Sequence, residues 1–279
     1  MTLKADFKGR LIAIGGNEDR VDEQIVLKRV VSEIGKKDFS VAVITTASEE
    51  PIQRGKEYHK VFKSLGAQSV EILSMQKRKE ANDATIAHLL DKVDLTFISG
   101  GDQLRLTTII GGSKVLDSLH RRLNNGGLIA GTSAGAAVFS DTMIYEGKSE
   151  EGLLKGKVYT RAGFGFVENI VFDTHFMTRG RIGRLVQVVT TNPTCIGVGI
   201  GDDSAVILNG DGTMEVIGSG QVIIVDGSMI RHSNIMEIKK GGAIAVENIR
   251  VHSLVHNYRY AFKNRKFLTP KTKQKATKK

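Results

Sequence analysis

Short apolar runs rich in Ile and Val alternate with amphipathic helical patterns along the first half of the chain, and this alternation constrains the fold more than any other feature. The runs are apolar on both faces and end in small residues. Such strands are typical of a parallel sheet whose faces are covered by crossover helices. The sequence therefore predicts an α/β fold of three layers, α/β/α, with a mostly parallel central sheet.

The expected elements follow from the two periodicities of the sequence. We expect strands at 11–14, 41–45, 70–73, 95–99 and 127–130, and helices at 22–34, 52–65, 82–90, 113–123 and from 134 onward. Buried strands are also expected at 170–173 and 196–200, with a helix at 182–190. Beyond residue 203 the runs at 205–208, 214–217 and 222–225 alternate with turns, which predicts a C-terminal antiparallel β extension.

Composition favours one folded unit with a charged tail. The 279 residues are 41% hydrophobic and 25% charged, which are ordinary values for a globular protein. The formal net charge is +10, but eight basic residues and no acidic one lie at 263–279, so the rest of the chain is nearly neutral. We expect a single domain at 1–262 and a disordered basic tail at 263–279. Loose attraction of that tail to a polyanion stays open, although nothing else indicates a nucleic-acid partner.

The same composition excludes several classes of protein. No apolar run is long enough to cross a bilayer, and the N-terminal residues lack the apolar core of a signal peptide. We therefore expect a soluble cytoplasmic protein without a membrane partner. Cys195 is the only cysteine, which excludes an intrachain disulfide and a cysteine-based zinc site.

The strongest local signal is Gly131-Thr132-Ser133-Ala134-Gly135, which fits the pattern G-x-S-x-G between a predicted strand and a predicted helix. A serine on such a sharp turn has an exposed hydroxyl, and the flanking glycines let the backbone bend. The next amide, that of Ala134, points toward the place where an oxyanion would form. The pattern predicts Ser133 as a nucleophile, and a turn without chemistry is the alternative.

A nucleophilic serine needs a base, and seven histidines are available. Among these, His175 directly follows the predicted strand at 170–173, at the edge where open α/β sheets place their ligands. Asp202 and Asp203 follow the strand at 196–200, so either could orient the imidazole. The chain order would be Ser, His, acid, which differs from the order in α/β-hydrolases.

Two glycine pairs also end predicted strands. Gly100-Gly101 could bring a second backbone N–H to the oxyanion, with Gln103 within reach of a polar substrate, or could simply be a turn. The loop Gly15-Gly16-Asn17-Glu18-Asp19 lacks the lysine of a P-loop and the third glycine of a dinucleotide site. We therefore do not expect nucleotide binding.

Three arginines and an acid lie beside the predicted base, in the stretch Asp173-Thr174-His175-Phe176-Met177-Thr178-Arg179-Gly180-Arg181-Ile182-Gly183-Arg184. A guanidinium offers a planar fork of donors that suits carboxylates. The cluster predicts a substrate that carries several carboxylates, with Asp173 available for a cation. A basic surface at a helix start is the alternative.

Taken together, these stretches resemble the cyanophycinase family of serine peptidases. The resemblance runs from Gly15-Gly16-Asn17-Glu18-Asp19 to the segment 199–205, and its most specific parts are the 131–136 turn and the 173–184 stretch. It implies a fold like that of class I glutamine amidotransferases, no metal or cofactor, and a homodimer. It also implies hydrolysis of cyanophycin, a poly-aspartate with arginine on each side-chain carboxyl, to β-aspartyl-arginine dipeptides.

The resemblance also assigns roles by position. Ser133 would be the nucleophile and His175 the base. The oxyanion donors, Gly101 and Ala134, come from the residues themselves and not from the resemblance. The substrate pocket would be lined by Gln103, Asp173, Thr174, Arg179, Arg181 and Arg184.

Two positions depart from the family pattern. Asp202 stands where the family has a glutamate, so the loop must move inward or the contact with His175 must be longer or bridged by water. Thr174 stands where a glutamine is common, which changes one hydrogen bond of the pocket. An aspartyl dipeptidase of the same fold and a catalytically weak peptide-binding homologue therefore remain as alternatives.

Overall fold

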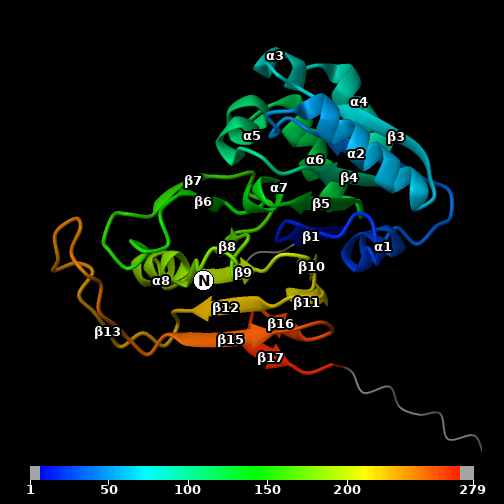
Figure 1. The fold of residues 1–279 in the computed structure, drawn as a ribbon. Helices are drawn as coiled ribbons and strands as arrows, with labels where there is room; N and C mark the ends of the chain where they lie inside the picture. Colours follow the sequence, from blue (N-terminus) through cyan, green and yellow to red (C-terminus); the bar gives the residue numbers. More distant parts are fainter. Residues whose placement is uncertain (1–6, 271–279) are drawn as a thin grey trace, which may run out of the picture.

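The computed structural model describes residues 7–270, and its largest sheet has nine strands (Figure 1). Five parallel strands form one half of this sheet: β1 (Arg10–Ile14), β2 (Phe39–Ile44), β3 (Ala67–Leu73), β4 (Leu95–Ile98) and β5 (Leu128–Thr132). Four antiparallel strands continue it beyond β1: β10 (Ser204–Asn209), β11 (Thr213–Gly218), β16 (Arg259–Ala261) and β17 (Lys266–Leu268). The strand order is β17-β16-β11-β10-β1-β5-β4-β2-β3.

Helices cover both faces of the parallel half, which confirms the predicted three layers. One face carries α1 (Ile25–Ser32) and α2 (Pro51–Ser64). The other carries α3 (Arg78–Ala81), α4 (Ala84–Lys92), α5 (Gln103–Ile110) and α6 (Lys114–Asn124). The helices bury their apolar stripes against the strands, as the Phe97 ring of β4 does at 4.6 Å from the Tyr58 ring of α2.

A second sheet of four strands packs on the α6 side of the first. It contains β8 (Ile170–Asp173), β9 (Ile196–Ile200), β12 (Val222–Asp226) and β15 (Arg250–Leu254), in the order β15-β12-β9-β8. Apolar side chains of β8 and β9, such as Phe172 and Val198, share one core with the larger sheet. The helix α8 (Ile182–Thr191) covers the opposite face with Leu185 and Val189. The strands predicted at 170–173 and 196–200 are therefore present, but in a sheet of their own.

Several small elements differ from the predictions. The helix expected from residue 134 onward is the single turn α7 (Ala134–Ala137). Helix α5 was not predicted, although Asp102 caps it by accepting hydrogen bonds from the backbone of Leu104 and Arg105. Two short hairpins complete the described chain: β6 (Thr142–Glu146) with β7 (Tyr159–Ala162), and β13 (His232–Ser233) with β14 (Val246–Glu247).

The predicted basic tail begins too early at residue 263. Strand β17 lies inside it and pairs with β16, with Tyr260 opposite Phe267. Arg265 also forms an ion pair with the buried Asp226. The apolar pair and the ion pair hold this segment on the sheet, and 271–279 lie outside the described residues. Within 7–270 we find no helix with the length and apolar character needed to cross a membrane.

Two sheet edges meet at the predicted site. The carboxyl ends of β1, β4 and β5 lie at one edge of the larger sheet because these strands are parallel. The parallel strands β8 and β9 end beside it, and the loop 201–203 carries the chain from β9 directly into β10. The backbone N–H of His175 donates to the carbonyl of Gly15 at 2.8 Å, which joins the two edges.

Candidate active site

Ser133 lies on a sharp turn between β5 and α7. Its backbone has φ 53° and ψ −115°, a conformation that costs about 1–3 kcal/mol outside glycine and persists only where the surroundings fix it. A Cβ on Gly131 would collide with the carbonyl of Gly135, so the close approach of strand and helix requires the glycines of the pattern. The turn has the strand–turn–helix context that the sequence pattern requires.

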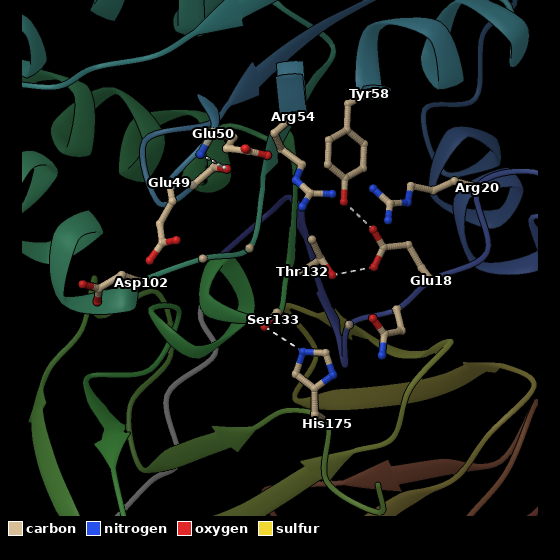
Figure 2. Close-up of a pocket in the computed structure, with 15 residues that line it drawn as sticks. Glu18, Arg20, Glu49, Glu50, Arg54, Tyr58, Asp102, Thr132, Ser133 and His175 are labelled. Atoms are coloured by element: carbon tan, nitrogen blue, oxygen red, sulfur yellow. Dashed lines mark hydrogen bonds between the residues drawn. The ribbon is translucent and has the colours of Figure 1, made fainter. Parts of the chain in front are cut away.

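A continuous hydrogen-bond chain joins the three predicted catalytic residues. Ser133 Oγ lies 3.0 Å from His175 Nε2, and His175 Nδ1 lies 2.6 Å from Asp202 Oδ1 (Figure 2 shows the first contact). The contact with Asp202 is direct and short. The longer or water-bridged contact considered from the sequence is therefore wrong for this structure, because the 201–203 loop brings the shorter side chain to the ring.

Two further side chains hold Asp202 in place. Asn17 Nδ2 donates to Asp202 Oδ2 at 3.1 Å, and Thr178 Oγ1 donates to the same oxygen at 2.6 Å. Partial burial raises the pKa of Asp202, but the hydrogen bonds from Thr178, Asn17 and His175 outweigh it and lower the pKa below its ordinary value. Asp202 is therefore ionised at neutral pH, and its other oxygen, Oδ1, faces the imidazole.

The imidazole of His175 is held neutral and closely packed. Burial lowers its pKa below the ordinary value, and the hydrogen bond with Asp202 acts in the opposite direction. A neutral ring can accept a proton from a hydroxyl, which a charged ring cannot. Gly16, with φ 104°, lies against the ring, and a Cβ there would collide with it. Only glycine at this position leaves room for the ring in its present place.

The two predicted oxyanion donors lie beside the serine. Ala134 and Gly101 line one small cavity together with Ser133 and His175. Within residues 7–270, neither the Ala134 nor the Gly101 backbone N–H donates a hydrogen bond to another protein group. Free N–H groups beside a hydroxyl are the arrangement that stabilises negative charge on a substrate oxygen.

We call this small cavity, of about 260 Å³, the arginine cavity. Its lining includes every residue predicted to bind substrate: Gln103, Asp173, Thr174, Arg179, Arg181 and Arg184. Asp173 is 2% exposed and contacts Arg181 at 3.1 Å and Arg184 at 3.1 Å. Burial raises the pKa of Asp173, and the two guanidinium groups act in the opposite direction.

The three arginines are not equivalent. Arg181 and Arg184 contact Asp173, whereas the exposed Arg179 side chain forms no ion pair among residues 7–270. The Gln103 amide donates to the carbonyls of Ile144 and Tyr145, at 3.3 and 3.2 Å, so it holds the cavity wall. The net positive charge of the arginine cavity suits a ligand with carboxylate groups.

A larger cavity, of about 580 Å³, opens on the other side of Ser133. Figure 2 shows Glu49 and Asp102 on one side of it, and Glu18, Arg20 and Tyr58 on the other. Asp102 caps helix α5, and Arg20 contacts Glu57 at 3.0 Å.

Within residues 7–270, no group of three or more His, Cys, Asp or Glu side chains is arranged to hold a metal ion.

Sequence reasoning missed the supporting residues of the site. Asn17 and Thr178 anchor Asp202, and Glu18 accepts a hydrogen bond from Thr132, the neighbour of Ser133. The loop 15–19 stood out in the sequence as a phosphate site to be rejected and as one end of the family resemblance, but neither use assigned it a role at the active site. Its position at the end of β1, beside the serine turn at the end of β5, was the signal that could have placed it here.

Comparisons with known proteins show the family of the chain. The model of Peptidase family S51 matches residues 11–216. A cyanophycinase from Trichormus variabilis is 34% identical over 254 residues, which cover 91% of this chain and 85% of that relative. A cyanophycinase from Geminocystis herdmanii is 33% identical over 96% of this chain and 98% of its own length.

Solved structures share the fold. The crystal structure of a peptidase from an acI-B1 actinobacterium superposes with a TM-score of 0.67 at 20% identity, covering 92% of this chain and 98% of that one. Fold, site and relatives together define a serine-type peptidase, a hydrolase. The chain belongs to peptidase family S51, and the resemblance to cyanophycinases stated from the sequence is confirmed.

Proposed function

We propose that this peptidase hydrolyses cyanophycin to β-aspartyl-arginine dipeptides through an acyl-enzyme on Ser133. The observation that carries the proposal is the hydrogen-bond chain from Ser133 through His175 to Asp202, which opens on the arginine cavity. The cyanophycinase relatives, at 33–34% identity over most of the chain, support the choice of polymer.

The reaction begins with attack by Ser133. His175 Nε2 takes the hydroxyl proton while Oγ bonds to the aspartyl carbonyl carbon, and the carbonyl oxygen becomes an oxyanion. The N–H groups of Ala134 and Gly101 stabilise that charge. The imidazolium then gives its proton to the leaving nitrogen as the C–N bond breaks, which leaves an ester on Ser133.

Water completes the cycle. His175 removes a proton from a water molecule, whose oxygen attacks the ester carbonyl, and Ser133 leaves with the proton that His175 returns. Asp202 stays ionised throughout and stabilises the imidazolium without taking the proton. Its low pKa, set by the hydrogen bonds from Thr178, Asn17 and His175 against the effect of burial, suits this part.

The arginine cavity supplies the recognition of the acyl side. Arg179 is exposed at its mouth and is available to a substrate carboxylate. Arg181 and Arg184 are aligned by Asp173 and present fixed guanidinium planes to the same space. Since cyanophycin has a backbone of aspartate units, its backbone carbonyls and terminal carboxylate match these donors.

The test is incubation of the protein with purified cyanophycin, followed by mass analysis of the soluble products. The proposal predicts β-aspartyl-arginine, with no product from a Ser133→Ala protein. A parallel assay with an α-aspartyl dipeptide tests the alternative activity. Cleavage of this dipeptide, without release of dipeptides from cyanophycin, would assign an aspartyl dipeptidase. Binding of cyanophycin without any product would assign a peptide-binding homologue.

Two expectations stay predictions. They are the homodimer, which the resemblance implies, and the cytoplasmic location, which the composition indicates. Light scattering during size-exclusion chromatography measures the first directly, and a molecular mass of twice the 30.4 kDa chain is expected.

A further inference from the structure

The loop Gly15–Asp19 touches every segment that carries a catalytic residue. Its contacts are the Gly15 carbonyl with the His175 backbone N–H, the Gly16 carbonyl with the Asp203 backbone N–H, the Asn17 amide with Asp202, and Glu18 with Thr132. One short loop at the end of β1 therefore connects the serine turn of one sheet with the histidine and aspartate of the other.

Glu18 is the member of this loop that faces the serine side. It is 5% exposed, and each carboxylate oxygen accepts a hydrogen bond from a hydroxyl (Figure 2). Tyr58 donates to Oε1 at 2.5 Å and Thr132 donates to Oε2 at 2.6 Å. Among the ion pairs of residues 7–270, none involves Glu18. A buried carboxylate is costly unless it is hydrogen bonded, so both hydroxyls are strongly held by it.

The hydrogen bond from Thr132 to Glu18 lies directly beside the nucleophile. Thr132 ends β5 and immediately precedes Ser133, whose backbone conformation needs support on both sides. On the helix side, the Ser133 carbonyl accepts hydrogen bonds from the N–H groups of Ala136 and Ala137, both at 3.0 Å. On the strand side, Glu18 holds the Thr132 side chain by accepting a hydrogen bond from its hydroxyl.

Glu18 itself is anchored to the layer of helices behind the sheet. Tyr58 is a buried residue of α2, and its ring packs against Phe97 of β4. The carboxylate thus links a fixed point in the core to the residue before the nucleophile. No hydrogen bond joins Glu18 to the side chains of Ser133 or His175, and its hydrogen bond to the serine turn is the one from Thr132.

We propose that Glu18 is a positioning residue, which sets the place of Ser133 Oγ relative to His175 by holding the hydroxyl of Thr132. This inference rests on the proposed function, because it requires Ser133 as the nucleophile. It predicts an effect on kcat with little effect on KM, since a misplaced nucleophile slows the reaction of substrate that is already bound.

The experiment compares Thr132→Val with Thr132→Ser in the full chain, with cyanophycin as substrate. Valine keeps the shape but removes the hydroxyl, and we expect kcat to fall on the order of 10- to 100-fold because Ser133 moves out of line with His175. Serine restores the donor, and we expect it to restore most of kcat. Rates are expressed per folded chain, with the folded fraction measured from the thermal unfolding transition, so that misfolded protein does not enter the comparison.

A change at the other partner tests the same bond. Glu18→Ala should lower kcat as Thr132→Val does, while Glu18→Gln, which keeps one carbonyl oxygen, should lower it less. Because the two residues act through one bond, the double variant Glu18→Ala with Thr132→Val should be little worse than either single variant. Additive losses would contradict the coupling.

A matched control removes a hydroxyl-to-carboxylate hydrogen bond of the same length between two helices that carry no catalytic residue. Ser118 Oγ of α6 donates to Asp91 of α4 at 2.6 Å, the same length and the same chemical type as the bond from Thr132 to Glu18. Ser118→Ala should therefore change the melting temperature but leave kcat as in the unmodified protein. This separates positioning from general stability.

Two results would overturn the proposal. The first is a normal kcat per folded chain in both Thr132→Val and Glu18→Ala, which would make the bond purely structural. The second is a raised KM with a normal kcat, which would make Glu18 part of substrate binding. A protein that neither reacts with the fluorophosphonate nor cleaves cyanophycin would fail the proposed function, and the positioning role with it.

Discussion

The two sheets contribute different things to the site. The larger sheet presents Ser133 on a strained turn, packed between strand and helix so closely that glycines are required on both sides. The smaller sheet presents His175 and Asp202 from the ends of two adjacent parallel strands, in loops held by hydrogen bonds from Asn17 and Thr178. The comparison shows that close backbone packing, with one polar contact through Thr132, holds the nucleophile, while hydrogen bonds from side chains of two loops hold the acid that orients the base.

The largest expected effect comes from the rigid side. Ser133→Ala should lower kcat on cyanophycin by about 10⁴- to 10⁶-fold, because the three residues act as one unit. Thermal unfolding should be nearly unchanged, since a hydroxyl is lost without leaving a buried group unpaired. Near-normal turnover in this variant would show that Ser133, and therefore the larger sheet, does not supply the nucleophile.

The next effect comes from the polar side. Asp202→Asn removes the charge that stabilises the imidazolium and should lower kcat by about 10²- to 10⁴-fold. Because Asp202 raises the pKa of His175 against the effect of burial, its loss should also lower that pKa further.

The pH profile of kcat/KM measures this shift. Activity requires neutral His175, so it should rise with pH through the pKa of His175, which in the unmodified protein lies below the ordinary value of about 6.5. In the Asp202→Asn variant the acid limb should move to lower pH. A shift to higher pH would show that another group sets the limb.

The arginine cavity offers a comparison within one cluster. Arg184→Ala leaves the buried Asp173 with a single partner and should lower the free energy of unfolding by about 3 kcal/mol. Arg179→Ala removes an exposed side chain and should leave unfolding unchanged while KM for cyanophycin rises. Denaturant titration and steady-state kinetics of both variants measure the split, and equal destabilisation would argue against it.

The smallest expected effect concerns the departure from the family pattern. The loop of this chain brings Asp202 directly to His175 at 2.6 Å, so a side chain one methylene longer would displace either the carboxylate or the ring. Asp202→Glu should therefore lower kcat, by about 10-fold, through misplacement of the ring. An increase in kcat would mean that the aspartate, and not its loop, is the weak element of the site.

Much of the fold was predictable because buried parallel strands have a distinct pattern. The runs at 11–14, 128–132 and 196–200 are apolar on both faces, and each ends in small residues. Helix α5 was missed because two glycines precede it and masked the cap at Asp102. The basic tail was placed too early because the surrounding charges hide the short strand Lys266–Leu268, in which only two residues are apolar.

The site was predictable only where a residue type carries its own chemistry. Ser133 and His175 follow strands and have an obvious use, so spacing and placement suffice to select them. The choice between Asp202 and Asp203 was open on spacing alone, because both follow the same strand. Contacts such as that of Glu18 with Thr132 join residues 114 positions apart, and the sequence holds no local signal for them.

Groups from two sheets form one reactive unit at Ser133. Labelling with a fluorophosphonate, followed by peptide mapping, measures this most directly. The account predicts one label per chain, on Ser133, and loss of labelling in a His175→Ala protein although its Ser133 is intact. A chain that digests cyanophycin while Ser133 stays unlabelled, or that labels equally without His175, would contradict it.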